Sequence, residues 1–424
     1  MRFLAFFLIV STVLALAYAY VGWRLIVPAG LSRAWAVAAW ALLLVLFLLP
    51  IITVLAQFNR ILPGAGGLLV WIGYLTLGLF SLVFTFLVLR DFAWLVYAGG
   101  EKVWGVIGRL GGASSEASPV FDAQRRAVLL QGTNLGILAL AAGLTGYGMF
   151  QARRRPAVIE VNVPLDNLPA ELDGFRIIQL TDIHAGLTVT REFVQMVVDI
   201  TNELKGDIVA FTGDLVDGTV NQLRDHVAPM ADLRSRYGSF FTTGNHEYYS
   251  GAEAWVEEAR RMGFEVLVNE HRVLIHNGRK IVLAGVTDTS GGQFIPHHAS
   301  DPHKAVAGAP PVDVKILLAH QPRSLHEATK AGFDLQISGH THGGQFFPWN
   351  LAAAVGQPFI EGLHRLERTW IYVSKGTGYW GPPVRLGARS EITVITLRRG
   401  AAARAVHVRT STPAGRAGTE VSAV

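Results

Sequence analysis

Hydrophobic residues are distributed very differently in the two parts of this chain. Within the first 150 residues, four runs are long and apolar enough to cross a bilayer, which takes about 20 helical residues. The four runs are roughly Phe3–Val21, Trp35–Phe58, Leu68–Leu89 and Val128–Phe150. Soluble cores rarely contain four such runs so close together, and a cleaved signal peptide would explain only the first. The pattern predicts a transmembrane helical domain of about four spans over residues 1–152, and an integral protein of the cell membrane.

The stretch between the third and fourth runs is longer and of mixed polarity. Its part Phe92–Leu110 has an amphipathic pattern, which predicts that this part lies along the membrane surface. Aromatic residues gather near the ends of the runs, as they do at membrane interfaces. They are Trp23, Trp71, Trp94, Tyr97 and Trp104.

After Arg155-Pro156 the pattern changes to short β-rich runs separated by turn residues. The predicted strands are Ala157–Val163, Phe175–Leu180, Ile208–Phe211, Ser239–Thr242, Arg279–Gly285, Val314–Leu318, Asp334–Ile337, Thr369–Val373 and Glu391–Leu397. Amphipathic helices are predicted between them at Thr190–Lys205, Gly251–Met262 and Ser324–Ala331. This alternation predicts an α/β domain over residues 153–399 whose strand-end loops are available for chemistry. The small, polar tail of residues 400–424 is predicted to be disordered.

The net charge of +5 belongs to the membrane part. Residues 1–150 hold nine Lys and Arg against four acids, whereas residues 151–424 hold 28 of each. A nucleic-acid enzyme usually carries its basic excess on the soluble domain, so nucleic acid is not expected as a partner. The chain has no cysteine, which excludes disulfides and thiolate metal sites.

Basic residues near the spans also bear on orientation. With four spans, the N-terminus and the α/β domain lie on the same side of the membrane, and the loops on the other side hold seven basic residues against five. The positive-inside tendency therefore predicts an extracytoplasmic α/β domain. The run Gln124-Arg125-Arg126 is either a degenerate twin-arginine export signal or a pair of anchoring arginines.

Five short polar motifs follow five of the predicted strands. They are Asp182-Ile183-His184, Gly213-Asp214, Gly244-Asn245-His246-Glu247, His320 and Gly339-His340-Thr341-His342. Groups at five strand exits can converge at one rim of the domain. Together the motifs supply three oxygen ligands and four imidazoles, with one histidine to spare for proton transfer. Two adjacent divalent metals can clamp the attacking and leaving oxygens of a phosphoryl displacement. The motifs therefore predict a metal-dependent phosphoester hydrolase.

This ordered set resembles the calcineurin-like metallophosphoesterase superfamily over roughly residues 157–398. Several spans followed by such a domain resemble the group of transmembrane proteins with a metallophosphoesterase domain. Gly343-Gly344-Gln345 and the run from Gly376 to Gly381 add to that likeness. The resemblance implies two packed mixed β-sheets flanked by helices, with metals between strand-end loops.

The resemblance also implies roles for individual residues. Those implied to bind the first metal are Asp182, His184 and His342. Those implied to bind the second are Asn245, His320 and His340. Asp214 would bridge both metals, since a carboxylate has two oxygens whereas a neutral imidazole offers one lone pair. His246 would donate a proton to the leaving oxygen or stabilise it, and a water activated by both cations would be the nucleophile.

The ligand types also constrain the metal, and two neighbouring acids have alternative roles. Mixed nitrogen and oxygen ligation without thiolate suits two divalent ions of Mn, Fe or Zn, and Mg²⁺ fits less well because of the imidazoles. Glu247 either orients His246 or is a solvated loop acid. Asp217 either supports Asp214 or caps the following turn. The histidines His297, His298 and His303 are interpreted as a solvated loop.

Departures from the superfamily pattern bear on the substrate. Phosphoprotein phosphatases of the superfamily carry an arginine shortly after Gly-Asp, and Gly213–Gly218 has none, which disfavours phosphoproteins. The membrane anchor favours a phosphorylated lipid, and the aromatic segments Phe346–Trp349 and Tyr379-Trp380 either form an apolar lip or pack in the core.

The expected partners are the bilayer and a lipid-linked phosphodiester or pyrophosphate. Some relatives resemble enzymes of lipid A biosynthesis that hydrolyse UDP-2,3-diacylglucosamine, which makes that compound the specific candidate. Such a cytoplasmic substrate conflicts with an outward orientation. The alternative to an enzyme is a non-catalytic membrane receptor or transport component whose domain binds metal or a headgroup. Oligomeric state is open.

Overall fold

The computed structural model describes residues 2–59, 66–110 and 123–400. These residues form two compact units, one lying largely within residues 2–147 and the other beginning at Gly148. Apart from Gly400, the predicted disordered tail lies outside the described residues.

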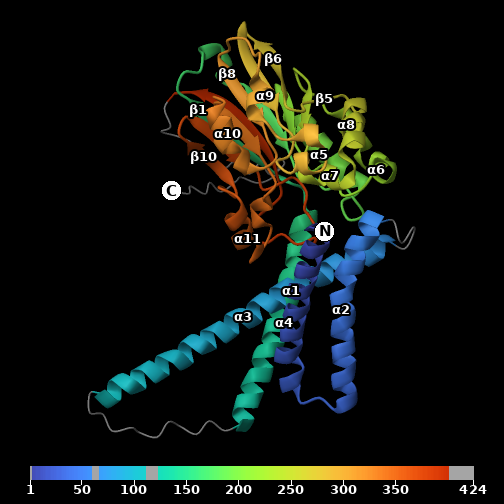
Figure 1. Ribbon diagram of the computed structural model, residues 1–424, viewed down its shortest axis with the longest axis vertical. Helices are drawn as coiled ribbons and strands as arrows, with labels where there is room; N and C mark the ends of the chain where they lie inside the picture. Colours follow the sequence, from blue (N-terminus) through green and yellow to red (C-terminus); the bar gives the residue numbers. More distant parts are fainter. Residues whose placement is uncertain (1, 60–65, 111–122, 401–424) are drawn as a thin grey trace, which may run out of the picture. The chain divides into compact units, whose positions relative to one another are not determined.

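The first unit consists of four long helices. They are α1 (Arg2–Leu25), α2 (Arg33–Asn59), α3 (Gly66–Leu110) and α4 (Ala123–Arg153). Each is long and apolar enough to cross a membrane, which confirms the predicted set of four spans. The segment Phe92–Leu110, predicted to lie along the membrane surface, is the continuation of α3, which runs unbroken through it (Figure 1). Arg90 and Asp91 interrupt the apolar run, but both are tolerated inside a helix, unlike proline.

Polar side chains inside this unit are paired with one another. The guanidinium Nη2 of Arg24 in α1 lies 2.5 Å from Oδ1 of Asp91 in α3, and the Tyr20 hydroxyl donates to Asp91 Oδ2 at 2.6 Å. Arg90 Nε donates to the same carboxylate at 3.0 Å, and Asn134 of α4 donates to the Arg24 carbonyl at 3.0 Å. Ionisable groups within membrane helices are normally paired in this way.

The second unit is built on two six-stranded sheets. The first has the order β1 (Ala157–Leu165), β12 (Glu391–Arg399), β2 (Arg176–Leu180), β3 (Ile208–Thr212), β4 (Ser239–Thr242) and β5 (Phe264–Val266). The second has the order β10 (Gly362–Leu366), β11 (Thr369–Val373), β9 (Leu335–Ser338), β8 (Val314–Leu318), β7 (Arg279–Gly285) and β6 (Glu270–His276). Strands β2 to β5 run parallel, as do β7, β8, β9 and β11. Both sheets also contain antiparallel pairs, which confirms the predicted mixed sheets.

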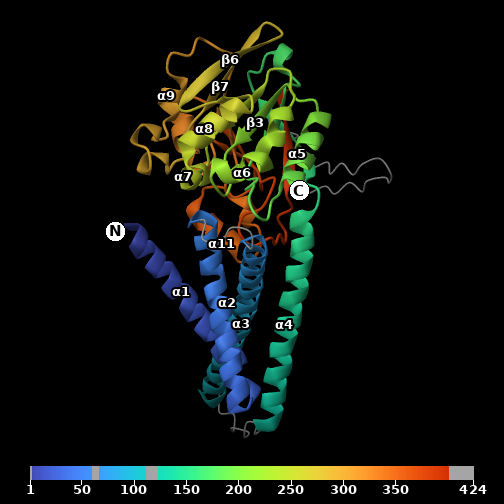
Figure 2. The same cartoon turned by 90° about the vertical axis from the view of Figure 1, so that its right-hand side faces the viewer.

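The core lies between the two sheets and beneath the helices that cover them. The inner faces meet through aliphatic side chains such as Ile177 and Ile208 from one sheet and Ile316 and Ile337 from the other. The outer face of the first sheet packs against α5 (Arg191–Glu203), α6 (Val220–Val227) and α8 (Ala252–Arg261), which Figure 2 shows together. The second sheet is covered by α9 (Pro302–Val306) and α10 (Leu325–Lys330). Both sheets are thus buried on two faces, as parallel strands require.

Candidate metal centre

The predicted ligands follow β2, β3, β4, β8 and β9, and Asn245 is the first residue of the short helix α7 (Asn245–Ser250). Their side chains form two groups in which the ligand atoms lie within 4.8 Å of one another. Asp182, His184 and His342 make one group, and Asp214, His320 and His340 make the other. Five loops distant in sequence therefore converge at one edge of the two sheets.

The first group is compact and buried. His342 Nε2 lies 3.5 Å from Asp182 Oδ1, and His184 Nε2 lies 4.0 Å from the same oxygen. The two Nε2 atoms are 3.1 Å apart. Two imidazole nitrogens and a carboxylate oxygen thus face a common point, which suits a borderline transition metal.

Asp214 lies between the two groups. Its Oδ2 is 3.1 Å from His320 Nε2 in the second group and 3.7 Å from His184 Nε2 in the first. His340 Nδ1 lies 3.2 Å from His320 Nε2. A carboxylate that faces both sets of imidazoles is placed as a shared ligand would need to be.

Asn245 is the seventh predicted ligand, and its side-chain oxygen tests whether a metal fits. Asn245 Oδ1 is buried and accepts no hydrogen bond from the residues that the structure describes. The neighbouring His246 amide donates to Asp214 Oδ1 at 2.8 Å, so Asn245 begins its helix beside the Asp214 carboxylate. An unpaired buried carbonyl is unfavourable by about 1–3 kcal/mol. A cation would supply the missing partner, and the donor set fits one.

The backbone of the ligand loops is unusual. Five of the seven predicted ligands have positive φ, a region that non-glycine residues rarely adopt. They are Asp182 (φ 53°), His184 (54°), Asp214 (58°), His340 (73°) and His342 (53°). Such strain is unfavourable by roughly 1–3 kcal/mol per residue and gathers at functional sites. The fold therefore holds these side chains inward against local preference.

Glycines allow the ligand loops to approach each other. A Cβ on Gly213 would lie 2.4 Å from the Gly244 nitrogen, and one on Gly244 would lie 2.2 Å from Asp214 Oδ1. A Cβ on Gly339 would lie 2.1 Å from Asp182 Oδ2. Because real Cβ atoms do not come so close, the glycines in three of the motifs are required by contact.

Hydrogen bonds fix three of the imidazole rings. Asp217 Oδ1 lies 2.9 Å from His184 Nδ1 and 2.6 Å from His246 Nδ1, and the Thr212 carbonyl lies 2.8 Å from His320 Nδ1. Carboxylate and carbonyl oxygens accept, so each ring carries its proton on Nδ1 and turns Nε2 inward. Asp217 therefore orients His184 and His246.

Arg385 orients His342 and is a residue that the motifs do not predict. Its fully buried guanidinium donates through Nη2 to His342 Nδ1 at 3.0 Å and to the carbonyls of Gly378 (2.6 Å) and Lys375 (2.8 Å). Burial lowers the pKa of Arg385 to about 10, against the opposing charges of Asp182 and Glu391. A guanidinium only donates, so in this structure Nδ1 of neutral His342 accepts and the ring carries its proton on Nε2. For the neutral ring to bind a cation through Nε2, that proton would have to move to Nδ1.

Glu247 supports the loops rather than His246. Its buried carboxylate accepts from the amides of Asp214 (3.0 Å), Leu215 (2.8 Å) and Gly244 (2.7 Å). Burial, followed by the negative charge of Asp214, raises the pKa of Glu247 to about 7. The interpretation of Glu247 as a solvated acid is wrong, and it instead joins two of the motifs. His298 is also buried rather than solvated, with Nδ1 2.9 Å from the Tyr248 hydroxyl.

The electrostatics of the rings differ across the site. Burial and then the neighbouring His320 lower the pKa of His340 to about 3, and burial and then His184 lower that of His342 well below its usual value. Both are therefore neutral, which metal ligation requires. Burial opposes protonation of His246, but the charges of Asp214 and Asp217 outweigh it and raise its pKa to about 9. Burial opposes protonation of His320 as well, but the charge of Asp214 outweighs it and raises the pKa of His320 well above its usual value. Of these two rings, His246 lies outside the two groups of predicted ligands, so its proton would not have to leave for a metal to bind.

Aromatic side chains continue outward from His246. The ring centroids of Tyr249 and Trp380 lie 5.2 and 5.7 Å from that of His246, and Phe294 lies 5.7 Å from Tyr249. Tyr249, Trp380 and Phe294 are each about half exposed, so they are not core residues. We call these three residues the aromatic row. It gives the side of the site next to His246 an apolar surface.

Comparisons with known proteins agree with this geometry. Residues 175–344 match the family described as calcineurin-like phosphoesterase. The chain is 39% identical over 305 residues to the Danio rerio "transmembrane protein with metallophosphoesterase domain", covering 70% of this chain and 69% of the relative. It is 41% identical over 268 residues to the Bos taurus protein of that name, covering 60% of each. An "uncharacterized metallophosphoesterase" of Helicobacter pylori is 36% identical over 275 residues, covering 64% of this chain and 72% of the relative. The chain therefore belongs to the calcineurin-like metallophosphoesterases and is a metal-dependent phosphoesterase.

Proposed function

We propose that this phosphoesterase holds two metals and hydrolyses a phosphodiester or pyrophosphate bond of a lipid-linked substrate. The observation that carries the proposal is the aromatic row beside His246, in a domain that follows four apolar helices. A proton donor flanked by exposed aromatic rings suits a substrate whose leaving portion is partly apolar.

The two metals would be divided between the two groups of side chains. Asp182, His184 and His342 would hold one cation, Asn245, His320 and His340 the other, and Asp214 would serve both. Two such cations polarise the phosphoryl group and make water a competent nucleophile near neutral pH. The thiolate-free donor set suits Mn, Fe or Zn.

His246 would supply the proton to the leaving oxygen. Nδ1 of His246 donates a hydrogen bond to Asp217 Oδ1 at 2.6 Å. Nε2 of His246 would therefore be the atom that meets the substrate. The backbone amide of His246 is tied to Asp214 Oδ1 at 2.8 Å, so the ring keeps a fixed distance from the shared ligand. A positioned imidazole of this kind contributes about 10²–10⁴-fold to the rate.

The charge of the domain also supports a lipid rather than a polyanion. Residues 151–424 hold equal numbers of basic and acidic residues, so no basic excess would attract nucleic acid. UDP-2,3-diacylglucosamine would need a cytoplasmic site, whereas the basic residues near the spans favour an outward one. A reporter fused after Val424 decides between these orientations, and therefore between cytoplasmic and external lipid substrates.

Two measurements test the function. Purified full-length protein should hydrolyse bis(4-nitrophenyl) phosphate in a metal-dependent way, and Asp214→Asn and His246→Ala should each lower the rate by about 10²-fold or more. His303→Ala, an exposed histidine outside the site, is the matched control. Full activity in both site variants would refute the proposal. Lipid extracts from cells lacking the gene should accumulate a phosphorylated lipid, and unchanged extracts would argue against a lipid substrate.

A further inference from the structure

Helix α11 (Trp349–Gly356) is an uncovered apolar helix in the catalytic unit. None of its eight residues is buried, and Trp349, Leu351 and Val355 are 50%, 59% and 91% exposed. The sequence from Gly343 to Ile360 contains no charged residue. Contiguous exposed apolar surface of this kind marks an interaction site in a folded protein.

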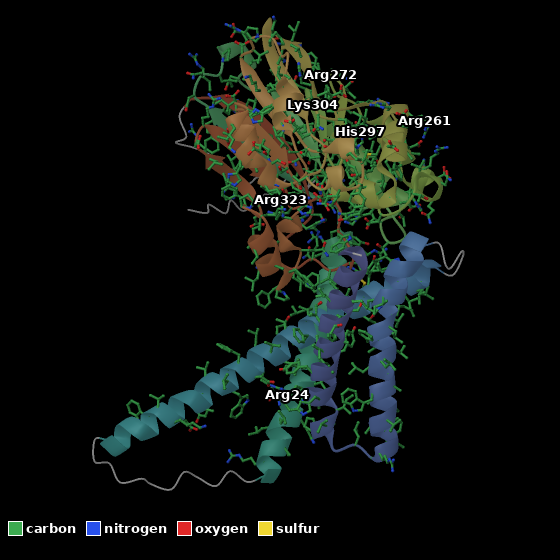
Figure 3. The ribbon with its side chains drawn as sticks, in the orientation of Figure 1. Arg24, Arg261, Arg272, His297, Lys304 and Arg323 are labelled. Carbon is green, nitrogen blue, oxygen red and sulfur yellow. The ribbon has the colours of Figure 1, made fainter. Side chains whose placement is uncertain are left out.

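The ends of α11 are fixed to the loops of the metal centre. Its first turn packs against the turn after His342, where a Cβ on Gly344 would lie 2.1 Å from the Asn350 Cα. At its other end lies Arg323, which is labelled in Figure 3. Arg323 donates from Nη2 to the Gly356 carbonyl at 2.8 Å and from its amide to Gln357 Oε1 at 3.1 Å. The helix therefore joins the loop of His342 to the loop of His320.

We propose that α11 is an interfacial helix that inserts its apolar side chains into the lipid bilayer. Its composition suits the headgroup boundary, because Trp349 in the helix and Phe347 just before it are aromatic and no charge must be desolvated. The exposed Arg323 at its end can meet an anionic phosphate headgroup.

The short connection to a candidate membrane span also favours a bilayer as the surface that α11 contacts. Only residues 154–156 separate α4, a candidate membrane span, from β1. Such a connection reaches no further than about 14 Å. The catalytic unit is thus kept within reach of lipid, whereas a protein partner would have to be recruited.

Insertion of α11 would hold the loops of His320 and His342 at the membrane surface, where a lipid-borne phosphate lies. This consequence deepens the proposed function, since it explains how a lipid-linked phosphoester reaches the metals. The membrane contact itself requires no turnover, and it can be tested separately.

The absence of cysteine from the chain allows a direct test. Val355→Cys in the full-length protein, labelled with a nitroxide and placed in nanodiscs of phosphatidylcholine and phosphatidylglycerol, gives a single reporter on α11. Ile275→Cys on β6, an aliphatic side chain that is 61% exposed, is the matched control. Power-saturation spectroscopy then compares collisions with oxygen, which is concentrated in lipid, and with a water-soluble nickel chelate.

The label at position 355 should collide several-fold more with oxygen than with the nickel chelate, and the label at 275 should show the reverse. Equal access of nickel to both labels would overturn the proposal. A label at 355 shielded from both reagents would mean that protein covers α11, and would also overturn it. Failure to find any phosphoester substrate would leave this result unchanged, so the two proposals fail independently.

Discussion

Asp217 shows how a single residue can serve two functions in this site. One of its oxygens accepts from His184, a proposed ligand of the first metal, and from His246, the proposed proton donor. Burial would raise the pKa of Asp217, but the charges of His184 and His246 outweigh it and lower that pKa well below its usual value. The carboxylate is therefore charged, and it fixes the orientation of both rings.

Asp217→Asn is expected to lower the turnover of bis(4-nitrophenyl) phosphate by about 10–100-fold, because the neutral amide loses the negative charge that helps to keep His246 protonated and is a weaker acceptor for both Nδ1 protons. The bound metal, measured by mass spectrometry, should fall less than turnover, since only one of seven proposed ligands loses its support. Asp225→Asn, on the exposed face of α6, is the control and should change neither quantity. Unchanged turnover in Asp217→Asn would contradict the positioning role.

The sequence motifs identify the residues of the two groups, but not what holds them. His184 and His342 can be found because Asp-x-His and Gly-His-x-His follow β-rich runs. Asp217 and Arg385 cannot be assigned in this way, since their role depends on contacts with segments distant in sequence. The positive φ at five ligands is likewise imposed by tertiary structure, against local preference.

At the scale of elements, burial decides which strands the hydrophobic pattern predicts. All nine predicted strands are present, and the three that the pattern does not predict are β5, β6 and β10. Each of these lies at the edge of its sheet. Edge strands such as β6 and β10 carry polar residues and are only partly buried, so the apolar signal that marks a central strand is weak in them.

The close approach between the loops after β3 and β4 gives a prediction at this scale. Gly213→Ala is expected to lower turnover by more than about 10²-fold and to reduce bound metal, because the added Cβ would meet Gly244 at 2.4 Å and His320 Nδ1 at 2.9 Å. Steady-state kinetics and metal analysis on the purified protein measure both effects.

Gly238→Ala provides the matched control. Gly238 has a similar positive φ of 96°, but a Cβ there would meet no atom within 4 Å. The control should lose stability by about 1–2 kcal/mol through backbone strain, yet retain its turnover. If the two variants were equally active, contact between the motif loops would not matter for the site.

At the scale of the whole molecule, the chain combines a helical unit without any predicted ligand and a catalytic unit that contains all seven. The composition and hydrophobic pattern are sufficient to predict this division, since apolar runs of about 20 residues and short alternating runs differ so clearly. The pattern ends the third span at Leu89, whereas α3 continues past the charged pair Arg90-Asp91, where the Asp91 carboxylate pairs with Tyr20 and Arg24. Nor does the pattern predict whether α11 is buried or exposed, since an aromatic segment can do either.

Removing the metals should therefore destabilise one unit and not the other. Ligands that bind only the folded state stabilise it by mass action, by about 4 kcal/mol at a free concentration of 1,000 times the dissociation constant. Stripping the purified protein with a chelator should lower the melting temperature of the catalytic unit by roughly 10 °C, given about 2–4 °C per kcal/mol for a domain of this size. Adding Mn²⁺ or Zn²⁺ should restore it, whereas Asp214→Asn, which lacks the carboxylate proposed to serve both metals, should respond weakly. Because the helical unit contributes no proposed ligand, its own unfolding transition should not shift. If the protein melted in the same way with and without metal, these buried groups would bind no cation.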